Sequence, residues 1–509
     1  MFAKVASAHL HGIEAIGVSV EADMGGSGFP SFAVVGLAEA AVKEGKERVR
    51  SALKNIGLNV FDRPIVVNLA PADIKKEGSH FDLPIAIGLL AALEPEKYNL
   101  ESTLIVGELS LDGALRGVAG VLCICSWAKD NGFKRVILPL DNADEAVLTP
   151  ELNVYPFKHL TGVVQFLQGE LKCEPHKRTS NDSLFDTLGS RYSADFSEIK
   201  GQYAARRAAE IASAGMHNII MMGTPGSGKT MLASRIPTIL PPMTLDEALL
   251  TTKVHSIAGL LRVKGSLVHE RPFIAPHHTA SNVAIIGGGA KAMPGHVSIA
   301  TNGVLFLDEM LEFNRSVLEV LRQPLEDGKV TIARAGRTVS YPAQFMLVAA
   351  CNPCPCGYYG DAKKKCVCSE QSIERYRARL SGPLLDRIDL QVHVASVEVS
   401  ALDDDKCGES SQDILKRVVR AHKIQSNRFA GMDIHFNSQM SERVMQECLN
   451  IDDGAKKLAI NAAAKFNLSA RAYNKVLKIS RTIADLADSA SVEPAHVSES
   501  LQYRMLDKQ

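Results

Sequence analysis

A glycine-rich run that ends in lysine and threonine is the segment best suited to chemistry. It reads GTPGSGKT, fits the pattern G-x-x-x-x-G-K-[ST], and lies between an apolar stretch at 218–222 and a helical segment from Lys229. In that setting backbone N–H groups surround phosphates, Lys229 reaches the β and γ phosphates, and Thr230 binds Mg²⁺. A glycine-rich turn without a ligand is the alternative, but strand, loop and helix together favour ATP and Mg²⁺ as cofactors. The predicted nucleotide-binding residues are Gly223, Thr224, Pro225, Gly226, Ser227, Gly228, Lys229 and Thr230.

Two carboxylates follow a second apolar stretch, VLFLDE, which ends in Asp308 and Glu309. Phosphoryl transfer needs one carboxylate to orient Mg²⁺ and another to polarise the attacking water. We expect Asp308 to take the first role and Glu309 the second. A buried strand with an acidic end of no catalytic importance is the alternative.

An amide and two arginines complete the predicted catalytic set. The apolar stretch 345–350 leads to Asn352, which stands where a sensor of the γ-phosphate or water would sit, although Asn before proline also forms turns. Arg387, in SGPLLDRIDL, and Arg471, in LSARAYNKVL, are the candidates for supplying positive charge to the γ-phosphate. Surface ion pairs are the alternative role for both.

Four of the ten cysteines crowd into two C-x-C pairs: Cys354, Cys356, Cys366 and Cys368. A loop that folds back would present four thiolates, which satisfy tetrahedral Zn²⁺. The spacing is tighter than the common C-x-x-C, so a redox pair or separate thiols are the alternatives. We favour a structural zinc site.

A basic hairpin is predicted at 326–340, EDGKVTIARAGRTVS, with Arg334 and Arg337 at its tip and Lys329 nearby. A ring of such tips would give a positive lining suited to DNA phosphates, whereas a solvated basic turn is the alternative. His277 and His278 lack an acid or thiol at ligand spacing, so we interpret them as packing residues or as part of a loop that faces nucleotide or DNA.

The elements that carry these residues indicate an α/β protein of three domains. An N-terminal domain is expected at 1–171, a polar linker at 172–192, a P-loop core at 193–396 with a cysteine-rich loop at 351–368, and a helical lid at 397–509. Strands are predicted at 15–20, 31–35, 64–69, 103–106 and 135–138, and N-terminal helices at 39–55, 83–93 and 121–131. The lid helices are expected near 410–430, 441–449, 452–466, 469–487 and 493–503.

Composition excludes several classes of protein. Lysine and arginine together number 57, as do aspartate and glutamate, so contacts with nucleic acid must come from local patches. Apolar residues make up 46% and charged residues 22%, typical of a globular chain. Neither an apolar run long enough for a bilayer nor a signal peptide is found, so we expect a cytoplasmic protein with no membrane contact.

Taken together, several long runs resemble the ComM/YifB family of Mg-chelatase-like AAA+ ATPases over nearly the whole chain. They are EGSHFDLPIAIGLLAAL, GELSLDGALRGVAGVL, IKGQYAARRAAEIASAGMHNIIMMGTPGSGKTMLA, RPFIAPHHTASN, GVLFLDEMLEFNRSVLEVLRQPLEDGKVTIARA, CNPCPCGYYGD and YRARLSGPLLDRIDL. The resemblance implies an N-terminal domain like those of Lon protease and ribosomal protein S5. An AAA+ module with a helix-2 insert and a presensor-1 hairpin, followed by the lid, is implied after it.

The family resemblance also implies roles and partners. ComM proteins look like homohexameric ring helicases that drive branch migration on DNA during its integration. By resemblance, Asn352 is sensor 1, Arg387 is an arginine finger offered to a neighbouring subunit, and Arg471 is sensor 2. Ile199 to Gln202 match the segment that lines the adenine pocket. A chelatase-like or remodelling ATPase that acts on a protein partner is the alternative.

The Lon-like resemblance raises the question of peptidase activity. Lon-like domains carry a Ser-Lys dyad, but here Ser79 is out of register and the expected lysine falls near Leu122. A serine without a lysine to take its proton has no evident activation. We therefore predict that the N-terminal domain has no peptidase activity.

Overall fold

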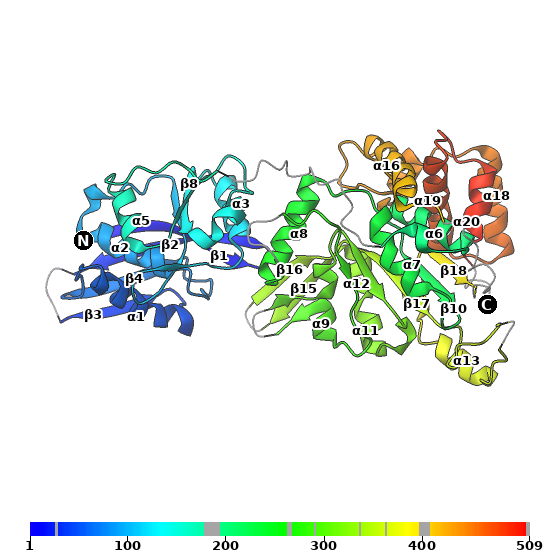
Figure 1. Ribbon diagram of the computed structural model, residues 1–509, viewed down its shortest axis with the longest axis horizontal. Coiled ribbons are helices and arrows are strands. Elements are labelled where there is room, and N and C mark those ends of the chain that lie inside the picture. Colours follow the sequence, from blue (N-terminus) through cyan, green and yellow to red (C-terminus); the bar gives the residue numbers. More distant parts are fainter. Residues whose placement is uncertain are drawn as a thin grey trace. The chain divides into compact units, whose positions relative to one another are not determined.

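The computed structural model describes residues 1–25, 29–177, 194–261, 267–289, 292–334, 337–361, 364–395 and 408–504 (Figure 1). The chain divides into two compact units, Met1–Asp186 with Ala248–Val268 and Thr187–Glu247 with His269–Gln509. Most of the predicted linker, 172–192, and the predicted boundary at 396–397 lie outside the described residues.

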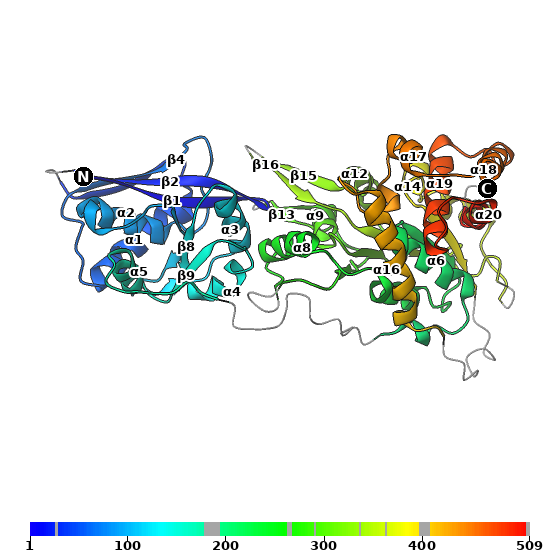
Figure 2. The same ribbon diagram turned by 90° about the horizontal axis from the view of Figure 1, so that it is seen from above.

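The first unit is built on a mixed seven-stranded sheet with the strand order β3-β4-β2-β1-β5-β8-β9. β1 and β2 form a long antiparallel hairpin, and β5, β8 and β9 pair in parallel. Figure 2 shows β1, β2 and β4 side by side. The strands of this sheet are β1 (Phe2–His11), β2 (Glu14–Met24), β3 (Ser31–Val35), β4 (Pro64–Ala70), β5 (Thr103–Ile105), β8 (Arg135–Pro139) and β9 (Asn153–Phe157). A separate antiparallel pair is formed by β6 (Glu108–Leu109) and β7 (Leu115–Arg116).

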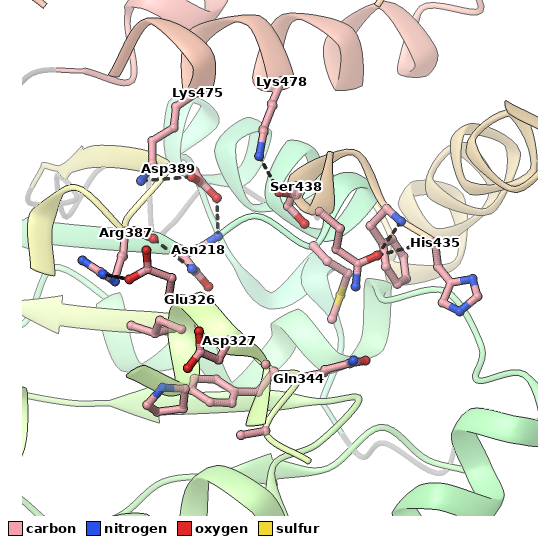
Figure 3. A pocket seen from close by; sticks show the side chains of 18 of the residues that line it. Asn218, Glu326, Asp327, Gln344, Arg387, Asp389, His435, Ser438, Lys475 and Lys478 are labelled. Carbon is pink, nitrogen blue, oxygen red and sulfur yellow. Dashed lines mark hydrogen bonds and ion pairs between the residues drawn. The ribbon is translucent and has the colours of Figure 1, made fainter. Parts of the chain in front are cut away.

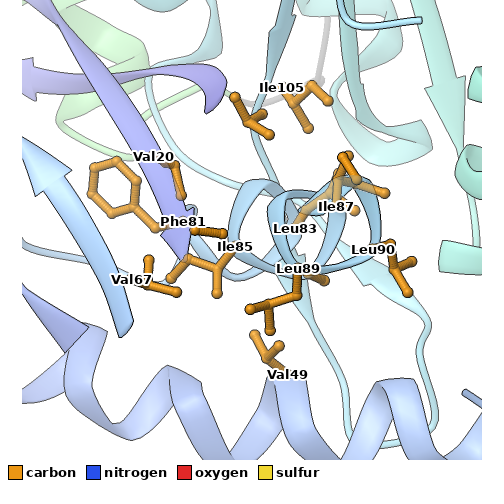
Figure 4. Packing of buried hydrophobic residues seen from close by; sticks show 14 of the residues in the cluster. Val20, Val49, Val67, Phe81, Leu83, Ile85, Ile87, Leu89, Leu90 and Ile105 are labelled. Carbon is orange, nitrogen blue, oxygen red and sulfur yellow. The ribbon is translucent and has the colours of Figure 1, made fainter. Parts of the chain in front are cut away.

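One helix of this unit, α2 (Asp82–Leu93), is buried along almost its whole length. Its sequence, DLPIAIGLLAAL, is apolar on all sides, which is the pattern of a helix enclosed by the core. Figure 4 shows Leu89 close to Val49, and Ile85 toward Val67. The unit's other helices are α1 (Ala40–Asn55), α3 (Val121–Asp130), α4 (Ala143–Ala146) and α5 (Leu160–Leu167), with the part of α8 (Leu245–Ile257) from Ala248.

The second unit contains a five-stranded sheet with the order β11-β14-β17-β10-β18, and every pair in it is parallel. Its strands are β10 (Ile219–Gly223), β11 (Phe273–Ile274), β14 (Val304–Leu307), β17 (Met346–Cys351) and β18 (Leu390–Val394). In a parallel sheet all carboxyl ends meet at one edge and all amino ends at the other. Two hairpins accompany the sheet, β12 (Gly287–Gly288) with β13 (Met293–Pro294) and β15 (Lys329–Arg334) with β16 (Arg337–Pro342).

The helices of this unit fall into two groups along the chain. The first group, interleaved with the strands, is α6 (Tyr203–Gly215), α7 (Lys229–Arg235), α9 (Asn282–Ile286), α10 (His296–Ile299), α11 (Arg315–Val320), α12 (Arg322–Asp327), α13 (Glu370–Arg377) and α14 (Gly382–Leu385). The C-terminal helices are α16 (Ser411–Arg428), α17 (Glu442–Cys448), α18 (Asp453–Lys465), α19 (Ala470–Leu486) and α20 (Pro494–Leu501). Side chains that accept backbone N–H groups begin four of these five helices, at Ser410, Ser441, Asp452 and Ser469.

Candidate active site

The glycine-rich loop joins β10 to α7 at the carboxyl edge of the parallel sheet. Gly226 and Gly228 have φ values of +77° and +87°, and a Cβ at either position would meet nothing within 4 Å. Left-handed backbone at both places explains why the sequence needs glycine there. The space around them fits a group that backbone N–H donors can surround, such as a phosphate.

Lys229, the first residue of α7, turns its amine back into the loop. Its Nζ donates to the carbonyl oxygens of Gly223 (2.7 Å) and Thr224 (2.9 Å), and it lies 3.3 Å from Oδ1 of Asn352. Burial lowers the pKa of this amine from its ordinary value. The predicted phosphate-binding lysine and the predicted sensor amide therefore lie within hydrogen-bonding distance of each other.

The acidic strand end reaches the same place. The hydroxyl of Thr230 donates to Oδ2 of Asp308 at 2.8 Å, the pairing expected of two residues that share a Mg²⁺ ion. Glu309 has left-handed backbone (φ 48°), and its N–H donates to Oδ1 of Asp308 at 2.9 Å. The structure thus brings Lys229, Thr230, Asp308, Glu309 and Asn352 together.

The loop of His277 and His278, predicted either to pack or to face nucleotide or DNA, brings His278 beside Glu309. Its Nδ1 lies 3.8 Å from Oε2 of Glu309, and its ring lies against that of His277 with 4.1 Å between centroids. β11 lies beside β14, and the histidines follow β11 at the edge of the sheet where β14 leads into Asp308 and Glu309. Strand order is a property of the folded sheet, so no motif in the sequence pointed to this particular contact.

The segment assigned to the adenine side also contacts the glycine-rich loop. The amide of Gln202 donates to the carbonyl oxygen of Ser227 at 3.1 Å, and Ile199 is buried. Gln202 has left-handed backbone (φ 53°) where α6 begins. Gln202 also donates to the carbonyl oxygen of Ala395, directly after β18, so residues 199–202 reach the loop from the β18 side of β10.

Arg387 and Arg471 lie elsewhere, at the amino edge of the sheet. Asn218, directly before β10, donates its side-chain N–H to the carbonyl oxygen of Arg387 at 2.9 Å. The Arg387 guanidinium donates to the carbonyl oxygen of Arg322 (3.0 Å) and pairs with Glu326. Both arginines line a cavity of about 450 Å³ that Figure 3 shows together with Asp389, Lys475 and Lys478. The structure does not bring them to the glycine-rich loop of their own chain.

The four cysteines form one cluster. Their sulfurs all lie within 4.8 Å of one another, with 3.4 Å from Cys354 to Cys356, 3.7 Å from Cys354 to Cys366 and 3.6 Å from Cys356 to Cys366. All four are free thiols rather than disulfides. The donor set is consistent with zinc.

The predicted basic hairpin is present as β15 and β16. Arg334 and Arg337 face each other in register at its tip, and Lys329 is paired with Pro342 at its base. The side chains of Arg334 and Arg337 lie outside the described residues. In the first unit, Ser79 donates to the carboxylate of Glu108, while Leu122 is buried in α3.

Three family models match successive parts of this chain. The model described as magnesium chelatase, subunit ChlI, matches residues 195–402, which contain the glycine-rich loop, Asp308, Glu309 and the cysteine cluster. A model for subunit ChlI of Mg-chelatase matches residues 20–142, and one for the ChlI C-terminal region matches residues 408–504.

Relatives that match the whole chain are more informative. The chain is 43% identical to "Competence protein ComM" of Haemophilus influenzae over 502 residues, which are 97% of this chain and 96% of that protein. The chain belongs to the ComM/YifB family. It is also 40% identical to YifB of Escherichia coli over 499 residues, 98% of this chain and 96% of YifB. A ChlI subunit of Mesostigma viride is 28% identical over 37% of this chain and 50% of its own.

Membership in the ComM/YifB family establishes the general activity. The chain is an ATPase of the Mg-chelatase AAA type, which implies ATP and Mg²⁺ as cofactors. The predicted α/β class, with a parallel core sheet and a helical C-terminal part, is confirmed. Among the described residues, no helix is long and apolar enough to cross a membrane.

Proposed function

We propose that this ATPase is a DNA motor, a homohexameric ring helicase that promotes branch migration while transforming or recombining DNA is integrated. The observation that carries the proposal is the separation of the two halves of the site. Lys229, Asp308 and Glu309 lie at one edge of the core sheet, and Arg387 and Arg471 lie at the other. A ring of identical subunits would bring one edge of each subunit to the opposite edge of the next.

The residues at the carboxyl edge fit Mg-ATP. Gly226 and Gly228 leave room for phosphate, Lys229 offers its amine, and Thr230 with Asp308 provides the oxygen ligands that Mg²⁺ prefers. Bound Mg-ATP supplies the γ-phosphoryl group. Glu309 would orient and polarise the attacking water, and Asn352 would hold water or the γ-phosphate in line.

Arg387 and Arg471 would act on the nucleotide of a neighbouring subunit. Each would offer positive charge to the γ-phosphate as negative charge spreads over its oxygens, with Arg387 as the arginine finger and Arg471 as sensor 2. Ile199 and Gln202 would contact the adenine. Because a neighbouring subunit would supply both arginines, ATP hydrolysis would require assembly of the ring.

The domain limits and the first unit are part of this proposal. We assign an S5/Lon-like domain to 1–171 and the AAA+ core, with helix-2 insert and presensor-1 hairpin, to 193–396, followed by the lid at 397–509. The buried Leu122 stands where a catalytic lysine is expected, and Ser79 donates to Glu108. We infer that this domain is a scaffold or binding module without peptidase activity.

DNA as the substrate is supported by the ComM relative, whose name refers to competence, and by the hairpin tip. Lys329, Arg334 and Arg337 would neutralise backbone phosphates in the ring's pore. The test is ATP hydrolysis with and without single-stranded and branched DNA, compared between the unaltered chain and an Arg334→Ala, Arg337→Ala variant.

Strong stimulation by DNA that the double variant loses is the expected result, with the DNA-free rate unchanged. A chain whose hydrolysis is indifferent to every DNA would contradict the proposal and would favour a chelatase-like or remodelling ATPase that acts on a protein. As a matched control we suggest Arg443→Ala, because Arg443 is an 88% exposed cation on α17 in the lid.

A further inference from the structure

We propose that Cys354, Cys356, Cys366 and Cys368 bind one Zn²⁺ and that the loop they close braces the glycine-rich loop through Gly357 and Pro225. On this view zinc occupancy sets how well the chain binds ATP. The inference rests on the nucleotide-site roles proposed above, and it adds a metal site that controls that site.

The sulfur positions fit a single tetrahedral ion. A Zn–S bond of about 2.3 Å places neighbouring sulfurs of a regular tetrahedron about 3.8 Å apart. The measured separations of 3.4, 3.6 and 3.7 Å, with all four sulfurs within 4.8 Å of one another, agree with that edge. An iron–sulfur cluster also takes four thiolates but holds them farther apart, around several metal ions.

The same loop touches the nucleotide site directly. Gly357 lies one residue after Cys356, and its N–H donates to the carbonyl oxygen of Cys354 at 3.0 Å. A Cβ on Gly357 would lie 2.6 Å from both Cγ and Cδ of Pro225, closer than real Cβ atoms approach a neighbour. The cysteine loop therefore packs its backbone against the second residue after Gly223.

The C-terminal end of the cysteine loop leads into α13, which connects it to the turn after Asp308 and Glu309. Cys368 directly precedes Ser369, whose side chain caps α13. Arg379, just beyond α13, donates to the carbonyl oxygen of Leu311 at 2.7 Å and pairs with Glu312. Helix α13 and Arg379 thus connect the end of the cysteine loop to the turn that follows Glu309.

A cross-link is needed because the segment has no regular structure of its own. Between Cys351 and Glu370 the described residues form neither helix nor strand. Loops of this length are held by functional constraints or by covalent or metal links, and four thiolates on Zn²⁺ contribute folding free energy directly. Loss of the ion should remove the packing of Gly357 against Pro225 and allow Asn352 to move.

Two glycines provide a matched pair of variants for the contact. Gly357 and Gly360 have φ values of +85° and +79°, so alanine carries a similar backbone cost at both. A Cβ at Gly360 would meet nothing within 4 Å, whereas one at Gly357 collides with Pro225. Both substitutions keep all four thiols.

The measurements are metal content by mass spectrometry and affinity for a fluorescent ATP analogue with Mg²⁺. We expect about one zinc per chain in the unaltered protein, in Gly357→Ala and in Gly360→Ala. Gly357→Ala should bind the analogue roughly 10-fold more weakly than Gly360→Ala, which corresponds to about 1.4 kcal/mol of lost binding free energy. Equal affinities of the two variants would overturn the bracing contact.

Removal of the metal provides an independent test of the proposal. Cys356→Ser with Cys366→Ser should lose zinc and lose affinity for the analogue, while Cys173→Ser, at an exposed cysteine outside the cluster, should change neither. A chain purified without zinc, or one that loses zinc and still binds the analogue normally, would overturn the proposal. Lys229→Ala should keep its zinc and lose the analogue, so a failure of the nucleotide-site assignment is seen separately.

Discussion

Replacing Arg387 by alanine should almost abolish ATP hydrolysis. Mixing this variant with a second inactive variant, Glu309→Gln, should restore part of the activity. Arg387 lies beside Asn218, before β10, and the glycine-rich loop begins where β10 ends at Gly223. A strand of this length spans about 16 Å at roughly 3.3 Å per residue, which exceeds the reach of an arginine side chain. An arginine finger contributes about 10³- to 10⁵-fold to the rate, so Arg387→Ala should lose at least ~10³-fold while still binding ATP.

Mixing that variant with Glu309→Gln tests whether the arginine acts across subunits. In a mixed ring, a complete site needs Glu309 from one chain and Arg387 from its neighbour. The Arg387→Ala chain provides the Glu309, and the Glu309→Gln chain provides the Arg387. In randomly mixed rings of equal composition about one quarter of the interfaces have that arrangement, so we expect up to about a quarter of the unaltered rate.

The assay is steady-state phosphate release after subunit exchange without nucleotide, with ring composition followed by native mass spectrometry. Arg443→Ala mixed with Glu309→Gln provides the reference for dilution by an inactive partner. Mixed rings that show no regained activity would refute action in trans, as would an Arg387→Ala chain that hydrolyses ATP normally by itself.

Three other perturbations follow from the same geometry. Lys229→Ala should abolish ATP binding measured by equilibrium fluorescence, and retained binding would contradict the role of its amine. Glu309→Gln should slow phosphate release by at least ~10²-fold yet keep affinity for ATP, because it alters water activation and not the phosphate contacts. Asp389→Asn should destabilise the second unit by about 3 kcal/mol in chemical denaturation, since it leaves Lys475, whose side chain is only 12% exposed, without its carboxylate 3.2 Å away. Burial opposes ionisation of Asp389, but Lys475 and His217 outweigh it and hold its pKa below the ordinary value. Its contribution to stability is therefore present above about pH 4 and lost as pH falls further, so the unaltered chain should lose thermal stability more steeply than the variant on acidification below about pH 4.

The sequence predicted elements best where local signals agreed with burial. The C-terminal helices carry Ser or Asp caps and apolar periodicity, and α16 and α19 begin within a residue or two of their expected positions. β1 was missed because polar Ser7 and His9 occupy buried positions of that strand and break its apolar alternation. The folded unit around them makes the burial of such side chains possible. A local sequence pattern does not contain that information.

For the candidate site, too, some contacts could be predicted from the sequence and others could not. The meeting of Thr230 with Asp308 could be predicted, because a strand–loop–helix motif and an acidic strand end imply two strands that finish at the carboxyl edge of one parallel sheet, where β17 separates β10 from β14. The approach of His278 to Glu309 and the contact of Gly357 with Pro225 depend on how loops cross at the sheet edge. Residue type and spacing carry no record of those crossings.

Buried polar contacts fasten the C-terminal helices to the core sheet. His217, just before β10, contacts Thr482 of α19 at 2.8 Å through its Nε2, and its Nδ1 lies 3.4 Å from Asp389. Lys475, one turn from Arg471 on α19, donates to the carbonyl oxygen of Ile388 at 2.9 Å. Because such networks are costly to break, α19 and the amino edge of the sheet should move together. Arg387 and Arg471 should therefore shift as one body with the sheet, and in the proposed ring such a shift would carry the state of one nucleotide site to the site of the next subunit.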